Sequence, residues 1–237
     1  MKIEIYADGP TVEELTELTS SYPIAGITTN PTLMKKIGVE NYKRYSLQIL
    51  EKANGLPVSL EVLSNNTSSI IKEARILQSW GKNVFVKIPI RNTDGEYLYH
   101  LIKELSHEGV QLNITAVFTE SQIENIHQCI NPESRTILSV FAGRIADAGK
   151  NPEVTVKHAV EMYKDKENTK VLWASPREPY NIIQAENIGC HIITLVPDLI
   201  RKTKSFGKNL EEFSLETSQM FFNDAQSCNF TIEDGEI

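Results

Sequence analysis

The sequence predicts an α/β protein built as a single (β/α)₈ barrel, a TIM barrel, with one additional helix near its C-terminus. Short apolar runs recur along the 237 residues, and each is followed by a stretch with helical periodicity. Strands that alternate with helices indicate parallel βαβ units. Eight such units in a chain of this length, without a linker that would divide it, are typical of the eight-stranded barrel.

The expected strands are short, rich in β-branched and aromatic residues, and bounded by polar or turn-forming positions. Side chains alternate between the two faces of a strand, so each run should present one face to the covering helices and the other to the barrel interior. The runs cover residues 3–8, 26–30, 58–63, 84–90, 111–117, 136–143, 170–175 and 190–197.

The expected helices follow these runs. The first begins at Val12 after Thr11, a residue that can cap a helix and that precedes two glutamates in the first turn. The others span residues 42–53, 67–80, 97–107, 119–129, 152–163, 178–188 and 199–203. A further helical pattern covers residues 210–222, so we expect one domain over residues 1–222 and a loose acidic tail over residues 223–237.

Composition narrows the class of protein. The formal net charge of −7 argues against a general nucleic-acid binder, which carries a basic patch. Cys129, Cys190 and Cys228 have no metal-binding spacing, and the five histidines form no ligand pair. The first residues lead directly into a strand pattern, and no apolar stretch is long enough for a membrane span. We therefore expect a cytoplasmic protein that binds neither nucleic acid nor membrane.

Lys87 interrupts the apolar run of residues 84–90 and lies on the strand face opposite its β-branched residues. Burying an unpaired ammonium is costly, so a lysine placed there loses its proton or finds a special partner. A neutral lysine is a nucleophile that forms Schiff bases with ketones and aldehydes. The alternative is a lysine at a strand edge, whose stem packs while its head reaches water.

Other polar residues recur at the carboxyl ends of the expected strands, where the functional groups of such barrels lie. The interior of a barrel is normally filled by Val, Ile and Leu, so polar residues on the same face of seven strands require a reason. The polar set, with Lys87, comprises Asp8, Thr28, Asn30, Ser59, Glu61, Asn113, Thr115, Ser139, Arg144, Ser175 and Arg177, and the aromatic Phe141 accompanies Ser139 on the same strand face.

Each of these residues also has a structural explanation. Asp8 could cap the helix that follows, and Glu61 could be a structural partner of Lys87 from the adjacent strand. The remaining explanations are turn chemistry for Thr28, Thr29 and Asn30, solvated loop charges for Arg144 and Arg177, and a polar core layer for Asn113, Thr115, Ser139 and Ser175. Because all of these groups would meet at one barrel mouth, their combination favours a functional site.

Seven segments of the chain resemble the transaldolase family, which includes the small transaldolases and the fructose-6-phosphate aldolases. The resemblance extends from about residue 3 to residue 222, and its most specific segments are Thr28-Thr29-Asn30-Pro31 and Val86-Lys87-Ile88-Pro89. The others are Ala7-Asp8, Ser59-Leu60-Glu61, Asn113-Ile114-Thr115-Ala116-Val117-Phe118, Ser139-Val140-Phe141-Ala142-Gly143-Arg144-Ile145 and Ala174-Ser175-Pro176-Arg177.

The resemblance implies a class I aldolase without a metal or cofactor, in which Lys87 forms the Schiff base. It implies that Asp8 is the general acid and base, and that Glu61 and Thr115 hold the catalytic water. The implied substrate-binding residues are Thr29, Asn30, Asn113, Ser139 and Phe141 around dihydroxyacetone, and Arg144, Ser175 and Arg177 around the sugar phosphate.

One departure from the family pattern is Pro176, where relatives have an aromatic or aliphatic residue. A proline biases the residue before it, here Ser175, toward extended geometry, which bears on the placement of Arg177. Small members of the family also have a C-terminal helix that reaches a neighbouring subunit in decamers. The resemblance thus implies a homo-oligomer, although the apolar residues of the last helix could equally cover this chain's own barrel.

Three hypotheses for function follow. The first is a transaldolase, which transfers dihydroxyacetone from a ketose phosphate such as fructose 6-phosphate or sedoheptulose 7-phosphate to an aldose phosphate. The second is a fructose-6-phosphate aldolase, which releases free dihydroxyacetone. At positions 61 and 141 the transaldolases resemble this chain, which has Glu61 and Phe141, whereas the aldolases have Gln and Tyr there. The third is a barrel that binds sugar phosphates without chemistry.

Overall fold

The computed structural model describes residues 2–228 and 232, and its first 201 residues form a closed barrel of eight parallel strands. The strands follow one another around the barrel in sequence order, and β1 pairs with both β2 and β8. They are β1 (Glu4–Asp8), β2 (Ile24–Thr28), β3 (Val58–Glu61), β4 (Val84–Pro89), β5 (Leu112–Val117), β6 (Thr136–Val140), β7 (Thr169–Trp173) and β8 (Ile192–Leu195). The predicted (β/α)₈ barrel is confirmed.

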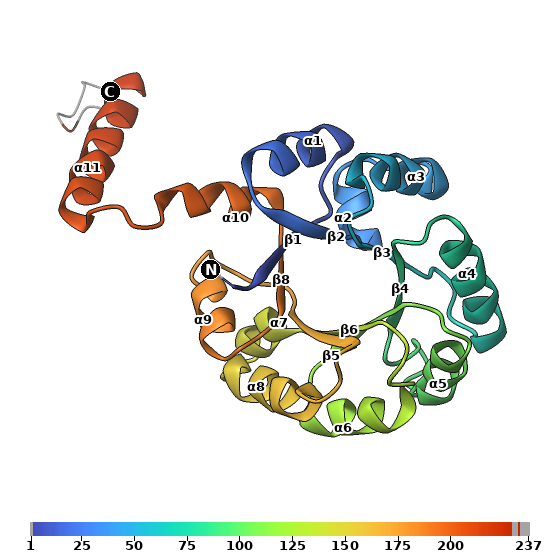
Figure 1. Cartoon of the computed structure of the whole chain (residues 1–237). Helices are drawn as coiled ribbons and strands as arrows, with labels where there is room; N and C mark the ends of the chain where they lie inside the picture. Colours follow the sequence, from blue (N-terminus) through green and yellow to red (C-terminus); the bar gives the residue numbers. More distant parts are fainter. Residues whose placement is uncertain (1, 229–231, 233–237) are drawn as a thin grey trace. The chain divides into compact units, whose positions relative to one another are not determined.

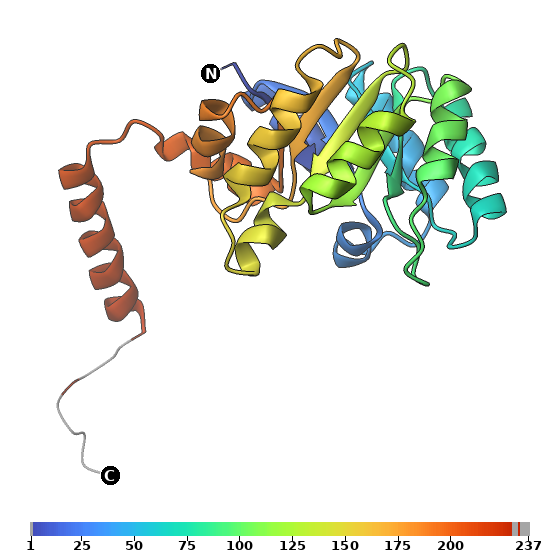
Figure 2. The same ribbon diagram turned by 90° about the horizontal axis from the view of Figure 1, so that it is seen from below.

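Helices surround the strands as an outer ring (Figures 1 and 2). They are α1 (Val12–Ser21), α2 (Pro31–Lys36), α3 (Tyr42–Ala53), α4 (Thr67–Ser79), α5 (Tyr99–His107), α6 (Glu120–Cys129), α7 (Ala142–Asp147), α8 (Pro152–Tyr163), α9 (Asn181–Asn187) and α10 (Pro197–Lys202). Local sequence explains several starts: Thr11 and Thr119 each form a capping box with the residue three positions on.

The two faces of each strand serve different cores. On β4, Val84, Val86 and Ile88 belong to the large apolar core that also includes residues of the helices. Phe85, from the other face, belongs to a smaller cluster with Tyr6, Ile137, Leu172, Ala174 and Ile192. This smaller cluster fills the barrel interior, and we call it the interior cluster. Lys87 shares the face of Phe85, as the alternation of the strand requires.

Strand ends differ from the sequence-based prediction where short helices follow. Residues 136–143 were predicted as one strand, but β6 ends at Val140 because the carbonyl of Phe141 accepts from the amides of Arg144 and Ile145 and so begins α7. Likewise β2 ends at Thr28, because Asn30 caps α2 and Pro31 occupies its first turn. Both helices place the residues after a strand at the barrel mouth.

A second unit covers residues 202–237 and is described by itself. It contains a 3₁₀ turn (Thr203–Ser205) and the helix α11 (Leu210–Ser227), whose cap Asn209 accepts from the amides of Glu211 and Glu212. The extra helix is confirmed, but its predicted end at Phe222 is wrong. The helix continues to Ser227, since residues 223–227 contain no helix breaker. Residues 229–231 and 233–237 of the predicted tail lie outside the described residues.

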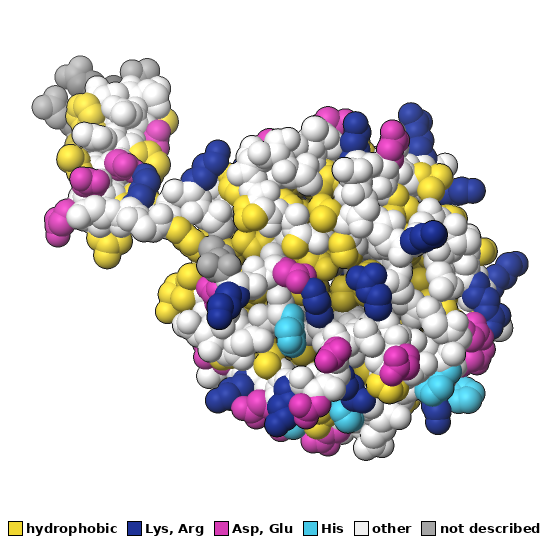
Figure 3. Space-filling model, viewed as in Figure 1, with side chains coloured by type: hydrophobic (Ala, Val, Ile, Leu, Met, Phe, Trp, Pro, Cys, Tyr) yellow, Lys and Arg dark blue, Asp and Glu magenta, His cyan; other side chains and the backbone are white. Residues whose placement is uncertain are grey.

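On the face shown in Figure 3, acidic and basic side chains are interspersed. No helix among the described residues is long and apolar enough to cross a membrane. Within the same residues, no group of three or more His, Cys, Asp or Glu side chains is arranged to hold a metal ion.

Candidate active site

A cavity of about 710 Å³ lies at the carboxyl ends of the strands. Its lining includes every residue that the family resemblance assigns to the site except Thr29 and Asn113. The strands and the short helices α2 and α7 deliver these side chains from distant parts of the sequence to one space. The predicted residues that line it are Asp8, Asn30, Glu61, Lys87, Thr115, Ser139, Phe141, Arg144, Ser175 and Arg177.

Lys87 is buried at the bottom of this cavity and has two partners. Its Nζ lies 3.0 Å from Oε2 of Glu61 and donates to the carbonyl oxygen of Thr29 at 2.9 Å. Only 8% of the Lys87 side chain and 17% of the Glu61 side chain are exposed. The pair forms because Glu61 and Lys87 are register partners on β3 and β4. A buried lysine was expected either to lose its proton or to find a special partner, and the structure shows a partner, the carboxylate of Glu61.

Asp8 ends β1 beside β2, where the hydroxyl of Thr28 donates to its Oδ1 at 2.8 Å. That hydroxyl also lies within hydrogen-bond distance of the hydroxyl of Thr194 on β8. Burial raises the pKa of Asp8, and the charge of Lys87 opposes this shift. The cap of α1 is Thr11, so the structural explanation of Asp8 as a helix cap is wrong.

Ser59, Asn113 and Ser139 form a chain of hydrogen bonds across β3, β5 and β6. The amide nitrogen of Asn113 donates to the Ser59 hydroxyl at 2.9 Å, and the Ser139 hydroxyl donates to the Asn113 carbonyl oxygen at 2.7 Å. Asn113 is fully buried and does not line the cavity, whereas Ser139 does. Of the polar core layer anticipated from the sequence, Asn113 and Ser139 are joined, whereas Thr115 and Ser175 are not part of the chain and Ser59 takes part instead. Through this chain Asn113 orients Ser139.

Thr115 lines the cavity with a hydroxyl that is buried and makes no hydrogen bond among the described residues. The next residue, Ala116, has a φ of 57°, and the pairing of β5 with β6 shifts register between Ile114 and Val117. Such an irregularity at a strand end re-aims neighbouring side chains. A buried polar atom without a partner requires an explanation, and a bound water or ligand supplies one.

Asn30 and Thr29 lie at the start of α2. The Asn30 Oδ1 accepts from the amide of Leu33, so this residue is the helix cap and also lines the cavity. The turn chemistry anticipated for it is confirmed. The hydroxyl of Thr29 donates to the carbonyl of Ser59 at 2.9 Å, and Thr29 does not line the cavity. Thr29 reaches the site through its backbone carbonyl, which holds Lys87.

Arg144 and Arg177 lie at the outer edge of the cavity, on α7 and on the loop after β7. Both side chains are exposed, and Arg177 forms an ion pair with Asp147 of α7. Neither an ion pair nor a hydrogen bond of the Arg144 side chain occurs among the described residues. The two arginines give this edge of the cavity its positive charge, part of which Asp147 offsets.

The expected extended geometry of Ser175 is wrong, because its φ is +61°. Proline disfavours the right-handed helical region for the residue before it, and here the left-handed region is occupied instead of the extended one. The turn brings the Ser175 carbonyl against Gly143, where an added Cβ would lie 1.5 Å from the carbonyl oxygen. The absence of a side chain at Gly143 thus allows α7 and the loop after β7 to meet.

Phe141 closes one side of the cavity. Its ring packs against Phe118, with the centroids 5.6 Å apart, and against the interior cluster. The lining also includes Thr194 of β8 and Asp198, which the prediction missed. Thr194 is the one polar residue of β8, so the parity rule applied to the eighth strand would have found it. Asp198 follows Pro197 at the start of α10 and carries no comparable signal.

Comparison with known proteins agrees with this geometry. The family model described as "Transaldolase/Fructose-6-phosphate aldolase" matches residues 5–235. The chain belongs to this family. A "Probable transaldolase" of Herpetosiphon aurantiacus is 31% identical over 222 residues, which cover 92% of this chain and 96% of that protein. One of Dehalococcoides mccartyi is 32% identical over 196 residues, covering 81% and 86%.

Solved structures with the same fold are more distant. One described as "Native KDPGal structure" has a TM-score of 0.52 and 11% identity, covering 97% of each chain. At this identity the likeness shows the barrel fold alone. Membership of the transaldolase family therefore rests on the family model and the relatives of about 30% identity, and it identifies this chain as a transaldolase-type enzyme.

Proposed function

We propose that this transaldolase-family protein transfers a dihydroxyacetone unit from a ketose phosphate, such as fructose 6-phosphate or sedoheptulose 7-phosphate, to an aldose phosphate. The observation that carries the proposal is a buried lysine, paired with a glutamate, at the bottom of a cavity with arginines at its edge. Binding a sugar phosphate needs no buried amine. Forming a Schiff base with a ketone does, and Lys87 is the group that would do so.

Asp8 is the group proposed to move the proton at the carbon–carbon bond. In retro-aldol cleavage the substrate hydroxyl loses its proton as the bond breaks, and the electrons pass to the protonated imine on Lys87. Asp8 takes that proton and later returns it to the alkoxide formed on the acceptor aldehyde. The raised pKa of Asp8 suits a group that must be both base and acid, because its two protonation states are closer in free energy at neutral pH.

Glu61 and Thr115 are proposed to hold the water released and consumed during Schiff-base chemistry. Thr115 offers a buried hydroxyl without a partner, and the carboxylate of Glu61 already contacts the nitrogen of Lys87. A carboxylate at this distance can accept a proton when the carbinolamine forms and return it when water leaves. An amide in the same place would orient the water without exchanging a proton.

The donor would lie with its dihydroxyacetone end near Asn30 and Ser139 and its phosphate near Arg144 and Arg177. The arginine fork binds phosphate oxygens in pairs, and both arginines line the cavity on the side of α7. Ser175 offers a hydroxyl at the same edge. Asn113 acts through Ser139, because it is fully buried outside the cavity lining and its carbonyl oxygen accepts from the Ser139 hydroxyl.

Transfer is favoured over release of free dihydroxyacetone by Glu61 and Phe141. Phe141 has no hydroxyl, so it cannot protonate the enamine that remains on Lys87 after cleavage. The enamine then persists until an aldehyde arrives. The alternative, a fructose-6-phosphate aldolase, carries Gln and Tyr at these positions.

The first test is reduction with borohydride in the presence of fructose 6-phosphate, followed by peptide mapping. We expect a stable added mass on the peptide that contains Lys87, and no labelling in Lys87→Met. Phe85→Leu, a change on the same strand face outside the cavity, serves as the matched control and should still be labelled. Labelling of another lysine would contradict the proposed nucleophile. Absence of labelling in the unaltered protein would favour a barrel that only binds.

The second test separates transfer from release. Fructose 6-phosphate is incubated with the protein, with and without erythrose 4-phosphate, and glyceraldehyde 3-phosphate and dihydroxyacetone are measured. We expect glyceraldehyde 3-phosphate to accumulate rapidly only with the acceptor. Equal rates with and without acceptor, with free dihydroxyacetone appearing, would establish the aldolase instead.

We also propose that the protein forms a homo-oligomer through α11, and a decamer is one such assembly. None of the side chains of this helix is buried, although it carries Phe213, Leu215, Met220, Phe221 and Phe222. An isolated helix of this kind is marginal in water, so a partner surface would stabilise it. Light scattering on the full chain tests the proposal, since a monomeric mass would contradict it.

A further inference from the structure

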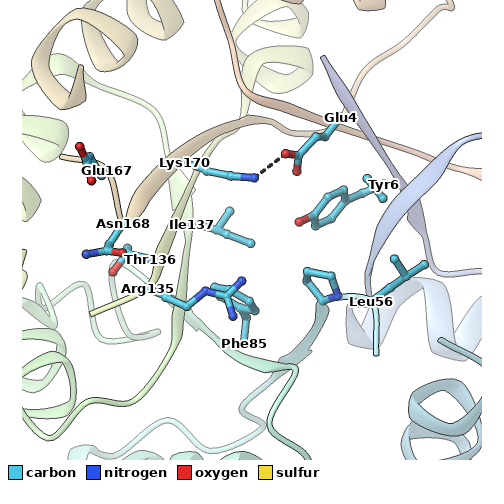
Figure 4. A pocket seen from close by; sticks show the side chains of 12 residues that line it. Glu4, Tyr6, Leu56, Phe85, Arg135, Thr136, Ile137, Glu167, Asn168 and Lys170 are labelled. Atoms are coloured by element: carbon cyan, nitrogen blue, oxygen red, sulfur yellow. Dashed lines mark hydrogen bonds and ion pairs between the residues drawn. The ribbon is translucent and has the colours of Figure 1, made fainter. Parts of the chain in front are cut away.

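A second cavity, of about 400 Å³, lies among residues at the amino ends of the strands (Figure 4). Its volume is within the range of roughly 300–1,000 Å³ typical of small-molecule sites. None of the proposed catalytic residues lines it. Tyr6, Phe85 and Ile137 form its bottom, and we call these three residues the apolar floor. Each is at least 97% buried, so the cavity has a preformed and largely aromatic base.

Arg135 is the basic group of the rim with capacity to bind a ligand. Its guanidinium lies over the ring of Phe85, 5.0 Å from the centroid, and its Nη1 donates to Oε1 of Gln111 at 2.8 Å. A guanidinium has five N–H donors, and this is the one hydrogen bond of the Arg135 side chain found among the described residues. Stacking on Phe85 holds the guanidinium in place and leaves its remaining donors free.

The other charges around the cavity are either paired or peripheral. Lys170 and Glu4 form an ion pair with each other and neutralise one another (Figure 4). Glu167 is exposed and lies apart from Arg135 in the same view. The hydroxyl of Tyr6 points toward the middle of the cavity and makes no hydrogen bond within the described part of the chain. Burial raises the pKa of Tyr6, so this hydroxyl is an uncharged donor at neutral pH.

We propose that this second cavity binds a small organic carboxylate, whose charged end pairs with Arg135 and whose apolar body lies on the apolar floor. The planar fork of a guanidinium matches the two oxygens of a carboxylate. The Tyr6 hydroxyl is placed to donate to the same group. One unpaired cation balances a monoanion, and an aromatic base suits an apolar body better than a sugar. The proposal is independent of the proposed transaldolase activity, because it involves neither Lys87 nor its cavity.

The test is calorimetric titration of the full chain with benzoate, with its neutral analogue benzamide, and with inorganic phosphate. We expect benzoate to saturate a single site in the millimolar range or below, and benzamide and phosphate to bind at least about tenfold more weakly, since a charged hydrogen-bonded pair is worth that much. Benzoate that does not saturate, or benzamide that binds equally well, overturns the proposal. Phosphate that binds as well as benzoate overturns the choice of carboxylate.

Two substitutions locate the site. Arg135→Gln removes the charge and keeps the length, and should weaken benzoate by about tenfold or more. Arg144→Gln is the matched change in the other cavity and should leave benzoate affinity unchanged. The reverse result would place benzoate at the candidate active site and overturn the proposal. Tyr6→Phe removes only a hydroxyl, and it should weaken benzoate by a smaller factor. It provides the same test should Arg135→Gln fail to fold, since unchanged affinity in Tyr6→Phe would overturn the placement of the carboxylate beside Arg135 and the Tyr6 hydroxyl.

Discussion

Replacing Glu61 by Gln should destabilise the protein, because it leaves the ammonium of Lys87 buried without its counterion. The atoms Nζ and Oε2 are 3.0 Å apart, and the two side chains are 8% and 17% exposed. Removing one partner of a buried ion pair typically lowers the free energy of unfolding by about 3–5 kcal/mol. Gln keeps an oxygen that accepts from Nζ, and Lys87 keeps its bond to the Thr29 carbonyl. We therefore expect a loss of about 2–4 kcal/mol.

A double-mutant cycle isolates the contribution of the pair. Urea unfolding at pH 7 is measured for the unaltered protein, Glu61→Gln, Lys87→Met and the double variant. Because the double variant contains neither buried charge, we expect it to be more stable than the sum of the single losses implies, by more than about 1 kcal/mol. Equal m values across the four proteins are the control that the unfolded states are comparable.

Two results would refute this reasoning. One is a change of less than about 0.5 kcal/mol in Glu61→Gln, which is the size of an ordinary surface substitution. The other is additivity of the two single changes, which would mean that the charges do not interact across 3.0 Å. In either case Lys87 would not depend on Glu61, and the proposed role of Glu61 in exchanging protons with it would lose its basis.

Three further predictions concern other parts of the site. Asp8→Asn should abolish transfer yet stabilise the protein at neutral pH. Burial raises the pKa of Asp8, so above about pH 4 the native state holds more protons than the unfolded state, and the free energy of unfolding falls as pH rises. Urea unfolding from pH 4 to pH 8 should therefore show that the stability gained in Asp8→Asn grows with pH. Arg144→Ala should lower kcat/KM for fructose 6-phosphate by about tenfold or more beyond any loss of kcat/KM for fructose. Arg177→Ala should have a smaller effect, because Asp147 already forms an ion pair with Arg177. An equal loss of kcat/KM for fructose 6-phosphate and fructose would indicate a structural role. Gly143→Ala should lower the melting temperature and the activity together, since its Cβ would meet the Ser175 carbonyl at 1.5 Å, and an unchanged melting temperature would contradict the close approach.

The barrel could be predicted from the sequence because its signals are local and repeated. Each strand is an apolar run, and the alternation of its side chains between two faces also predicts which residues point into the barrel. That rule placed Glu61 and Lys87 on inner faces of adjacent strands, and the register of β3 with β4 brings them side by side. The bond between Asn113 and Ser139 followed from the same parity. Residues on strands were thus predicted well.

Features that depend on the path of the backbone could not be predicted in this way. Helices α2 and α7 have six residues each, too few for a helical period to stand out from an adjacent strand. The left-handed φ of Ser175 accompanies a close approach to Gly143, which lies far away in the sequence. The ion pair of Arg177 with Asp147 likewise joins a loop to helix α7, and the contact of Lys87 with the Thr29 carbonyl joins strand β4 to the loop after β2.

The interior cluster forms a partition across the barrel axis. On one side Leu172 lines the candidate active site, and on the other Tyr6, Phe85 and Ile137 line the second cavity. A partition made of one cluster of side chains excludes water only while those side chains remain closely packed. A substitution that removed volume from it, such as Leu172→Ala, would thin the partition between the two cavities. Water that passed the partition would reach the imine proposed on Lys87 from below, so in the proposed mechanism the apolar middle of the barrel would also govern how long this intermediate survives.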